Sequence, residues 1–174
     1  MIHKAKTEDV QKVVKIYEEI LEKQSEGSEC IGWIKGVYPT ERTALEALEK
    51  GELFVLEEDG TVLAAAKINQ EQMPAYREAK WEWAAADEEV MVLHTLVVSP
   101  DAAGKGFGTK FVRFYEEYAL QQGCRYLRMD TNEINTKARR LYKKMGYKEV
   151  GIIPCTFNGI ENVHLVCLEK KLAN

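Results

Sequence analysis

Hydrophobic residues recur along this chain with two spacings, one typical of helices and one typical of strands. The clearest helical pattern lies near the start, where apolar side chains return every three or four positions at Val10, Val13, Val14, Tyr17, Ile20 and Leu21. Thr40, directly after Pro39, is a suitable N-cap for a second helix. We expect that helix to carry Leu45 and Leu48 and to end at Gly51.

Short apolar runs separated by turn residues predict strands at residues 2–6, 53–57, 62–68, 90–98, 125–130, 147–153 and 163–168. The Asp-Gly pair at 59–60 and the Asn-Gly pair at 158–159 each lie between two of these runs and predict hairpin turns. Residues 90–98 are almost all apolar, which is typical of a central strand buried on both faces.

Two more helices are predicted after that central strand. The first ends near Gly123 and has one apolar face, made by Phe111, Phe114, Tyr115 and Tyr118. The second ends at Gly146 and has a face made by Ala138, Leu141, Tyr142 and Met145. The order β-α-α-β-β-β-α-β-α-β-β predicts an α/β (α+β) fold, a mixed sheet with helices on both faces, as a single domain over residues 1–174.

Composition removes several classes of function. The chain has 174 residues, 45% of them hydrophobic, and a formal net charge of −4, and it lacks a Lys/Arg run, so nucleic acid is not an expected partner. No apolar run is long enough to span a bilayer and the start has no signal-peptide pattern, so we expect a cytoplasmic protein that does not enter membranes. The four cysteines are far apart, which predicts neither a zinc site nor disulfides, but reduced and mostly buried thiols.

The candidate chemistry begins with the glycine-spaced turn after the central strand. Gly104, Gly106 and Gly108 offer backbone N–H groups without a covering Cβ, directly before a helix whose first N–H groups have no internal partner. Such a turn can hold an anion such as a pyrophosphate. A flexible strand-to-helix turn is the alternative.

A second block favours the binding site. From Asn135 the chain reads Asn-x-x-Ala-x-x-x-Tyr-x-x-x-Gly-Tyr, ending at Tyr147, and it follows a Leu-x-Val strand end at 96–98 and the glycine turn. Together these three parts, about a third of the chain, resemble the acetyl-CoA-binding half of the GCN5-related N-acetyltransferases (GNAT). Ala103 departs from the pattern, since the family usually has Gln or Arg there.

The resemblance implies a mostly antiparallel sheet that splays at its central strands after Leu96, with acetyl-CoA as co-substrate and no metal. Backbone groups of Leu96 and Val98 would pair with the pantetheine amides. Asn135 would reach the pantetheine or act only as a helix cap. The cofactor-binding residues predicted in this way are Leu96, Val97, Val98, Ala103, Gly104, Lys105, Gly106, Phe107, Gly108, Thr109, Asn135 and Ala138.

Tyr142 is the predicted general acid, because the resemblance places it where the family aims a tyrosine at the departing CoA sulfur. Full proton transfer from a phenol to a thiolate is uphill by about 2 kcal/mol, whereas a hydrogen bond that strengthens as charge develops costs less. Packing within the core is the alternative role for this residue. The base is harder to name: His94 is the first candidate, with a buried neutral histidine as its alternative, and Glu82 and Glu89 are weaker ones.

The acceptor side carries no motif. Trp33, Tyr38 and Glu82 are candidate substrate-binding residues. Residues 69–89 form an acidic segment that either connects two strands, with its tryptophans packed on the sheet, or folds over the pocket. If its acidic residues Glu78, Glu82, Asp87, Glu88 and Glu89 lie at the pocket mouth, cationic or neutral amines should be preferred to anionic ones.

Three functions agree with these features. The first is an N-acetyltransferase that acts directly on the primary amine of a small molecule or peptide. The second is an acyl-CoA sensor without catalysis. The third is a dinucleotide-binding enzyme, suggested by the glycines before a helix and by Asp130 at the end of the following strand, although the glycine spacing G-x-G-x-G differs from the usual fingerprint. A homodimer is compatible with the sequence.

Overall fold

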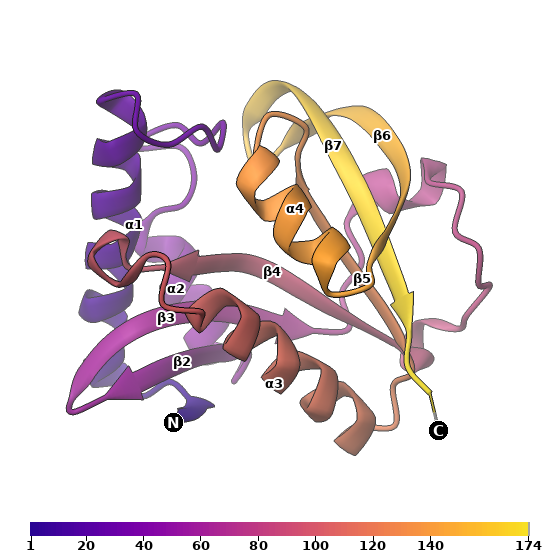
Figure 1. Cartoon of the computed structure of the whole chain (residues 1–174), viewed down its shortest axis with the longest axis horizontal. Coiled ribbons are helices and arrows are strands. Elements are labelled where there is room, and N and C mark those ends of the chain that lie inside the picture. Colours follow the sequence, from indigo (N-terminus) through magenta and orange to yellow (C-terminus); the bar gives the residue numbers. More distant parts are fainter. Residues whose placement is uncertain (174) are drawn as a thin grey trace.

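The computed structural model describes residues 1–173, which contain one seven-stranded sheet (Figure 1). In spatial order the strands are β1 (Ile2–Lys4), β2 (Leu53–Glu58), β3 (Thr61–Asn69), β4 (Val90–Val98), β5 (Tyr126–Asn132), β7 (Ile160–Lys171) and β6 (Lys148–Phe157). Neighbouring strands are antiparallel except for β4 and β5, which are parallel. The predicted mixed, mostly antiparallel sheet is therefore confirmed.

Helices cover both faces of this sheet, as predicted. One face of the amino-terminal half packs against α1 (Val10–Ser25) and α2 (Glu41–Glu49). The other face packs against α3 (Phe107–Gln121) and α4 (Thr136–Lys144). In α2 the predicted apolar face is partly wrong, because the helix buries Ala44 and Ala47 and leaves Leu45 exposed.

Both predicted hairpin turns are present. Asp59 and Gly60 have φ angles of 49° and 75°, and Asn158 and Gly159 have φ angles of 47° and 85°. Two successive residues with positive φ match the right-handed twist of the flanking strands, and Asn, Asp and Gly accept that conformation most easily.

The segment between β3 and β4 is a connector that packs on the sheet. Tyr76, a residue of this connector, is fully buried. The Trp81 ring packs against Tyr76 and against Arg128, whose guanidinium carbon lies 4.2 Å from the centroid of the Trp81 ring. Arg128 also donates a hydrogen bond to the Trp83 carbonyl. The connector thus takes the place of a helix over the carboxyl-terminal half of the sheet, which confirms the first of the two predicted roles.

The parallel pair β4–β5 separates partway along its length. Pairing runs only from Val90 opposite Tyr126 to Leu93 opposite Met129, after which β4 stays with β3 and β5 stays with β7. Figure 1 shows the two strands meeting at one end and spreading at the other. The splay expected after Leu96 therefore begins earlier, after Leu93.

The cysteines and the helices answer two further expectations. All four cysteines are free; Cys124 and Cys167 are buried, Cys155 is half-buried and Cys30 is exposed, so "mostly buried" holds for only part of the set. Within residues 1–173, no helix has both the length and the apolar character needed to cross a membrane.

Candidate active site

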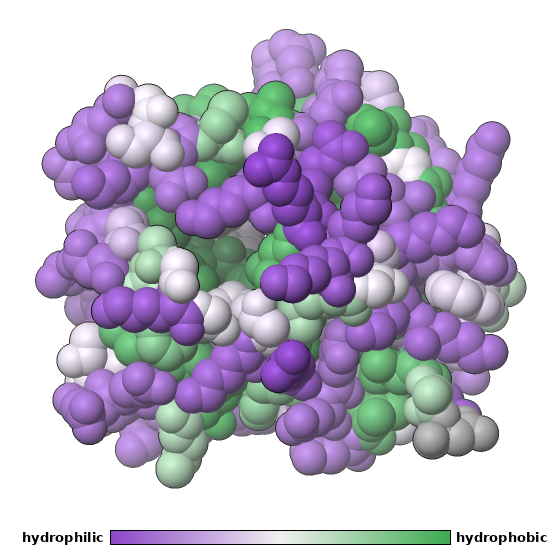
Figure 2. Space-filling model, in the orientation of Figure 1, coloured by the Kyte–Doolittle hydropathy of each residue, from purple (hydrophilic) through white to green (hydrophobic). Residues whose placement is uncertain are grey.

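A cavity of about 320 Å³ opens where β4 and β5 part. Its walls come from the separated ends of both strands, the glycine turn, α4, and the loop between α1 and α2. Figure 2 shows a hollow between α1 and α4 with an apolar floor and a hydrophilic rim. This size and lining are typical of a small-ligand site.

The glycine turn forms one end of this cavity. Gly104 and Gly106 have φ angles of 77° and 81°, and an added Cβ at either position would meet open space. The first hydrogen bond of α3 runs from the Lys110 N–H to the Gly106 carbonyl, 3.0 Å, so the N–H groups of residues 107–109 precede the helical pattern. An uncovered backbone at a helix start fits the pyrophosphate of a CoA ester.

Two residues of the turn behave differently from the rest. Gly108 allows close packing, because a Cβ there would lie 3.3 Å from the Leu141 side chain. The Lys105 side chain is exposed and does not line the cavity. Gly104 and Gly106 thus leave the backbone of the turn uncovered, whereas Gly108 brings α3 and α4 close together.

The edge of β4 and the start of α4 continue the cofactor side. Leu96, Val97 and Val98 line the cavity beyond the last β4–β5 pair, where the strand has β3 on only one side. Asn135 lines it too, but its Oδ1 accepts the Ala138 N–H at 3.1 Å. Its cap role is thus shown by geometry. The remaining predicted cofactor residues that line the cavity are Ala103, Phe107, Thr109 and Ala138.

Tyr142 reaches this cavity from the buried face of α4. Burial, and secondly the negative charge of Asp130, raise the pKa of its phenol above the ordinary value. The hydroxyl is therefore protonated at neutral pH and can donate a hydrogen bond into the cavity.

Asp130 is a site residue that was not among the predicted catalytic or binding residues of an acetyltransferase. It lies in β5 just past the last pair with β4, it lines the cavity, and its Oδ2 accepts a 2.6 Å hydrogen bond from the Tyr76 hydroxyl. Burial raises the pKa of this carboxyl to about 6, although the Tyr76 bond opposes that shift. Its signal in the sequence was an acidic residue at the end of a predicted strand, which pointed to a dinucleotide-binding enzyme rather than to a base.

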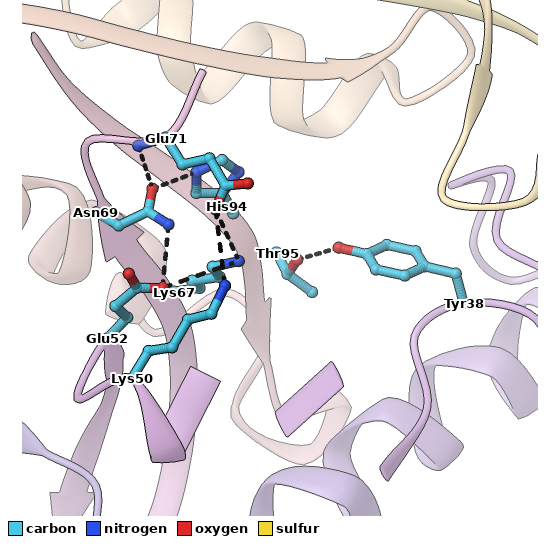
Figure 3. Close-up of polar contacts among 8 residues, drawn as sticks. All are labelled: Tyr38, Lys50, Glu52, Lys67, Asn69, Glu71, His94 and Thr95. Atoms are coloured by element: carbon cyan, nitrogen blue, oxygen red, sulfur yellow. Dashed lines mark hydrogen bonds and ion pairs between the residues drawn. The ribbon is translucent and has the colours of Figure 1, made fainter. Parts of the chain in front are cut away.

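His94 does not line the cavity, so the geometry gives no support to its predicted role as the base. A β-bulge interrupts the strand here: Thr95 has a φ of 52°, and the register shifts between the pairs Lys67–His94 and Ala65–Val97. Thr95 lines the cavity and hydrogen-bonds to Tyr38, whereas His94 points away and its Nε2 lies 2.7 Å from Asn69 Oδ1 (Figure 3).

The surroundings of His94 also make it a poor base. Burial, and then the charge of Lys67, lower the pKa of the imidazole to about 3. Asn69 links the ring to Glu52 and to the Glu71 backbone in a small polar cluster (Figure 3). This is the buried neutral histidine that was the alternative.

Aromatic residues form the other end of the cavity. Tyr38 stands between Trp33 and Phe157, edge to face with both, at centroid distances of 5.9 and 5.5 Å. All three rings line the cavity, so Trp33 and Tyr38 lie where acceptor-binding residues were expected.

The acidic residues of the connector lie elsewhere, and their expected place at the pocket mouth is wrong. Glu82 pairs with Lys148 at 2.9 Å, Glu89 accepts the Ala86 N–H, and none of residues 78, 82 and 87–89 lines the cavity. The side chain of Glu82 bonds to β6, and those of Asp87 and Glu89 bond to other residues of the connector. No group of side chains within residues 1–173 is suited to hold a metal ion.

Comparison with known proteins agrees with the cradle and the splayed sheet. The sequence model of the acetyltransferase (GNAT) family matches residues 13–147. The chain belongs to this family. It is an acyl-CoA-dependent acetyltransferase, as the resemblance of the glycine turn and the Asn135 block implied.

Individual GNAT relatives agree with this assignment. The chain is 26% identical over 148 residues to the uncharacterised N-acetyltransferase YhfO of Bacillus subtilis, covering 85% of this chain and 89% of that protein. A GNAT acetyltransferase structure from Streptococcus agalactiae has a TM-score of 0.84 at 19% identity, covering 100% and 96% of the two chains. The yncA structure from Salmonella typhimurium, solved with its cofactor acetyl-CoA, has a TM-score of 0.69 at 17% identity, covering 100% and 94%. The two structures show the shared fold.

Proposed function

We propose that this GNAT protein transfers the acetyl group of acetyl-CoA directly to the primary amine of a small molecule, with Tyr142 as general acid and Asp130 as proton acceptor. The observation that carries the proposal is the position of the two side chains in one cavity. Burial, and secondly the negative charge of Asp130, raise the pKa of Tyr142, so the two groups lie close enough to interact electrostatically.

The cofactor side fits a CoA ester. Gly104 and Gly106 leave space and N–H groups for the pyrophosphate, and the unpaired edge of β4 at 96–98 offers backbone partners for the pantetheine amides. Acetyl-CoA, when bound, supplies the acetyl group as a thioester and a thiol as leaving group.

The protein moves one proton at each end of the reaction. The bound ammonium first gives one proton to Asp130 and becomes a nucleophilic amine. An N–C bond then forms to the acetyl carbon, the C–S bond breaks, the nitrogen loses its second proton to water and the sulfur gains one. Asp130 accepts the first of these protons and later releases it to water. Tyr142 donates a hydrogen bond, and finally a proton, to the sulfur and is then reprotonated from water. The net products are the N-acetylated amine and free CoA.

The test combines binding and turnover. Acetyl-CoA should raise the melting temperature, because a ligand that binds only the folded state stabilises it by mass action, and NAD should not. Thiol release with a panel of primary amines then tests catalysis. No melting shift with saturating acetyl-CoA would overturn the cofactor assignment, and a shift without thiol release from any amine would favour the sensor alternative.

A further inference from the structure

The acceptor end of the cavity combines one unpaired carboxylate with aromatic walls. Besides raising the pKa of Tyr142, the charge of Asp130 adds to the burial that raises the pKa of Tyr38. Asp130 thus lines the same cavity as Tyr142 and the aromatic group made by Trp33, Tyr38 and Phe157, and its charge reaches both tyrosines.

Asp130 has no cationic partner among the described residues. Burial and the Tyr76 hydrogen bond are the influences on its carboxyl, and neither neutralises a negative charge. Burying an ionised carboxylate without a partner is unfavourable, so a cation brought by a ligand would be bound strongly.

The same cavity offers no free cation for an acidic ligand. Among the described residues that line it, Lys137 is the only cationic one, and its ammonium lies 3.5 Å from Glu29. An acceptor carboxylate near the reacting amine would thus face Asp130 without compensation.

We infer that the acceptor is a primary monoamine carried on a flat apolar body, with its ammonium on Asp130, its body between the rings of Trp33, Tyr38 and Phe157, and no carboxylate beside the amine. Aromatic rings contact flat apolar groups favourably and also attract the adjacent cation. This inference rests on the proposed function and names its substrate class.

Three probes separate the features of this acceptor. The probe 2-phenylethylamine carries both the primary amine and the flat apolar body. Phenylalanine adds a carboxylate beside the amine, and 1,4-diaminobutane lacks the ring. With acetyl-CoA and a thiol reagent, kcat/KM should be highest for 2-phenylethylamine. The kcat/KM for phenylalanine should be lower by about a hundredfold or more, because its carboxylate is repelled by Asp130. The kcat/KM for 1,4-diaminobutane should be lower by about tenfold or more, because it lacks the apolar contact.

Variants assign the preference to residues. Asp130→Asn should lower kcat/KM for 2-phenylethylamine by about a hundredfold and weaken its calorimetric binding to the CoA-loaded protein. Glu133→Gln removes the same charge just past the end of β5 and outside the cavity, and it should behave like the wild type in both measurements. Trp33→Leu should reduce the difference in kcat/KM between 2-phenylethylamine and 1,4-diaminobutane.

The outcomes distinguish this inference from the proposed function. An acetyl-CoA melting shift combined with equal or better turnover of phenylalanine or 1,4-diaminobutane, or with no turnover of the three probes, would overturn the acceptor class and leave the cofactor assignment standing. Absence of the melting shift would overturn both. The wild-type comparison decides the matter even if a variant does not fold.

Discussion

The hydroxyl of Tyr76 donates a 2.6 Å hydrogen bond to Oδ2 of Asp130, and so links the connector before β4 to the carboxylate in the cavity. Tyr76 is fully buried and belongs to a short 3-10 turn at Pro74–Glu78. Tyr76 does not line the cavity. The connector nevertheless contributes to the site, because Tyr76 holds Asp130, the group that we propose accepts the amine proton.

Tyr76→Phe should shift the pH profile to higher pH. The hydrogen bond lowers the pKa of Asp130, which burial raises to about 6, so removing the bond raises that pKa further. The acidic limb of kcat/KM against pH should move upward by the same amount. An unmoved acidic limb would show that another group controls it. Loss of one buried hydrogen bond should also cost about 1–3 kcal/mol of unfolding free energy.

Asp130→Asn should stabilise the fold at neutral and alkaline pH while reducing activity. Because the folded carboxyl has a pKa of about 6 against an ordinary value of 3.8, the native state binds more protons between these values, and wild-type stability falls as pH rises through them. The amide does not titrate. Denaturant titrations should show a gain of at most about 3 kcal/mol above pH 6 that disappears below pH 4. A variant less stable than the wild type at pH 8 would contradict the unpaired state of Asp130.

Tyr142→Phe removes one hydroxyl and keeps the ring that packs on the buried face of α4. If the hydroxyl stabilises the charge that develops on the leaving sulfur, kcat should fall by about ten- to a thousandfold, with acetyl-CoA affinity nearly unchanged. Single-turnover kinetics, with calorimetry for binding, measure both quantities. Wild-type kcat under conditions where chemistry limits turnover would return Tyr142 to a packing role.

Gly106→Val should abolish the acetyl-CoA melting shift. At a φ of 81° a branched residue is strained, and its side chain would enter the space left for the pyrophosphate. Gly27→Val is the matched control, because Gly27 has a φ of 80°, has equally open surroundings and lies outside the cavity. The control should lose similar stability and keep the shift. Equal acetyl-CoA affinity in the folded Gly106 variant would show that the pyrophosphate binds elsewhere.

His94→Gln should leave kcat/KM close to the wild type, since the imidazole faces Asn69 rather than the cavity. The amide can still donate to Asn69 Oδ1, so the polar cluster keeps one of its bonds. Steady-state kinetics on a variant with a normal melting curve are the measurement. A loss of about a hundredfold, the range for a missing general base, would restore His94 to the mechanism.

Local patterns in the sequence were enough to predict the order of helices and strands, both hairpins, the glycine turn and the family. These features depend on residues close together in the chain: apolar spacing on α1, positive φ at Gly60 and Gly159, and the spacing from Asn135 to Tyr147. The exact boundaries of these features were less well predicted, since β1 ends at Lys4 rather than Lys6 and the splay begins after Leu93 rather than Leu96.

The tertiary structure alone decided which charged groups share the cavity. A bulge at Thr95 interrupts the regular alternation of side chains along β4, so Thr95 lines the cavity and His94 lies outside it. Tyr76 and Asp130 are 54 positions apart, and nothing local relates them. Their contact exists only because the connector folds across the sheet and packs on its carboxyl-terminal half, and burial at the cavity raises the pKa of Asp130.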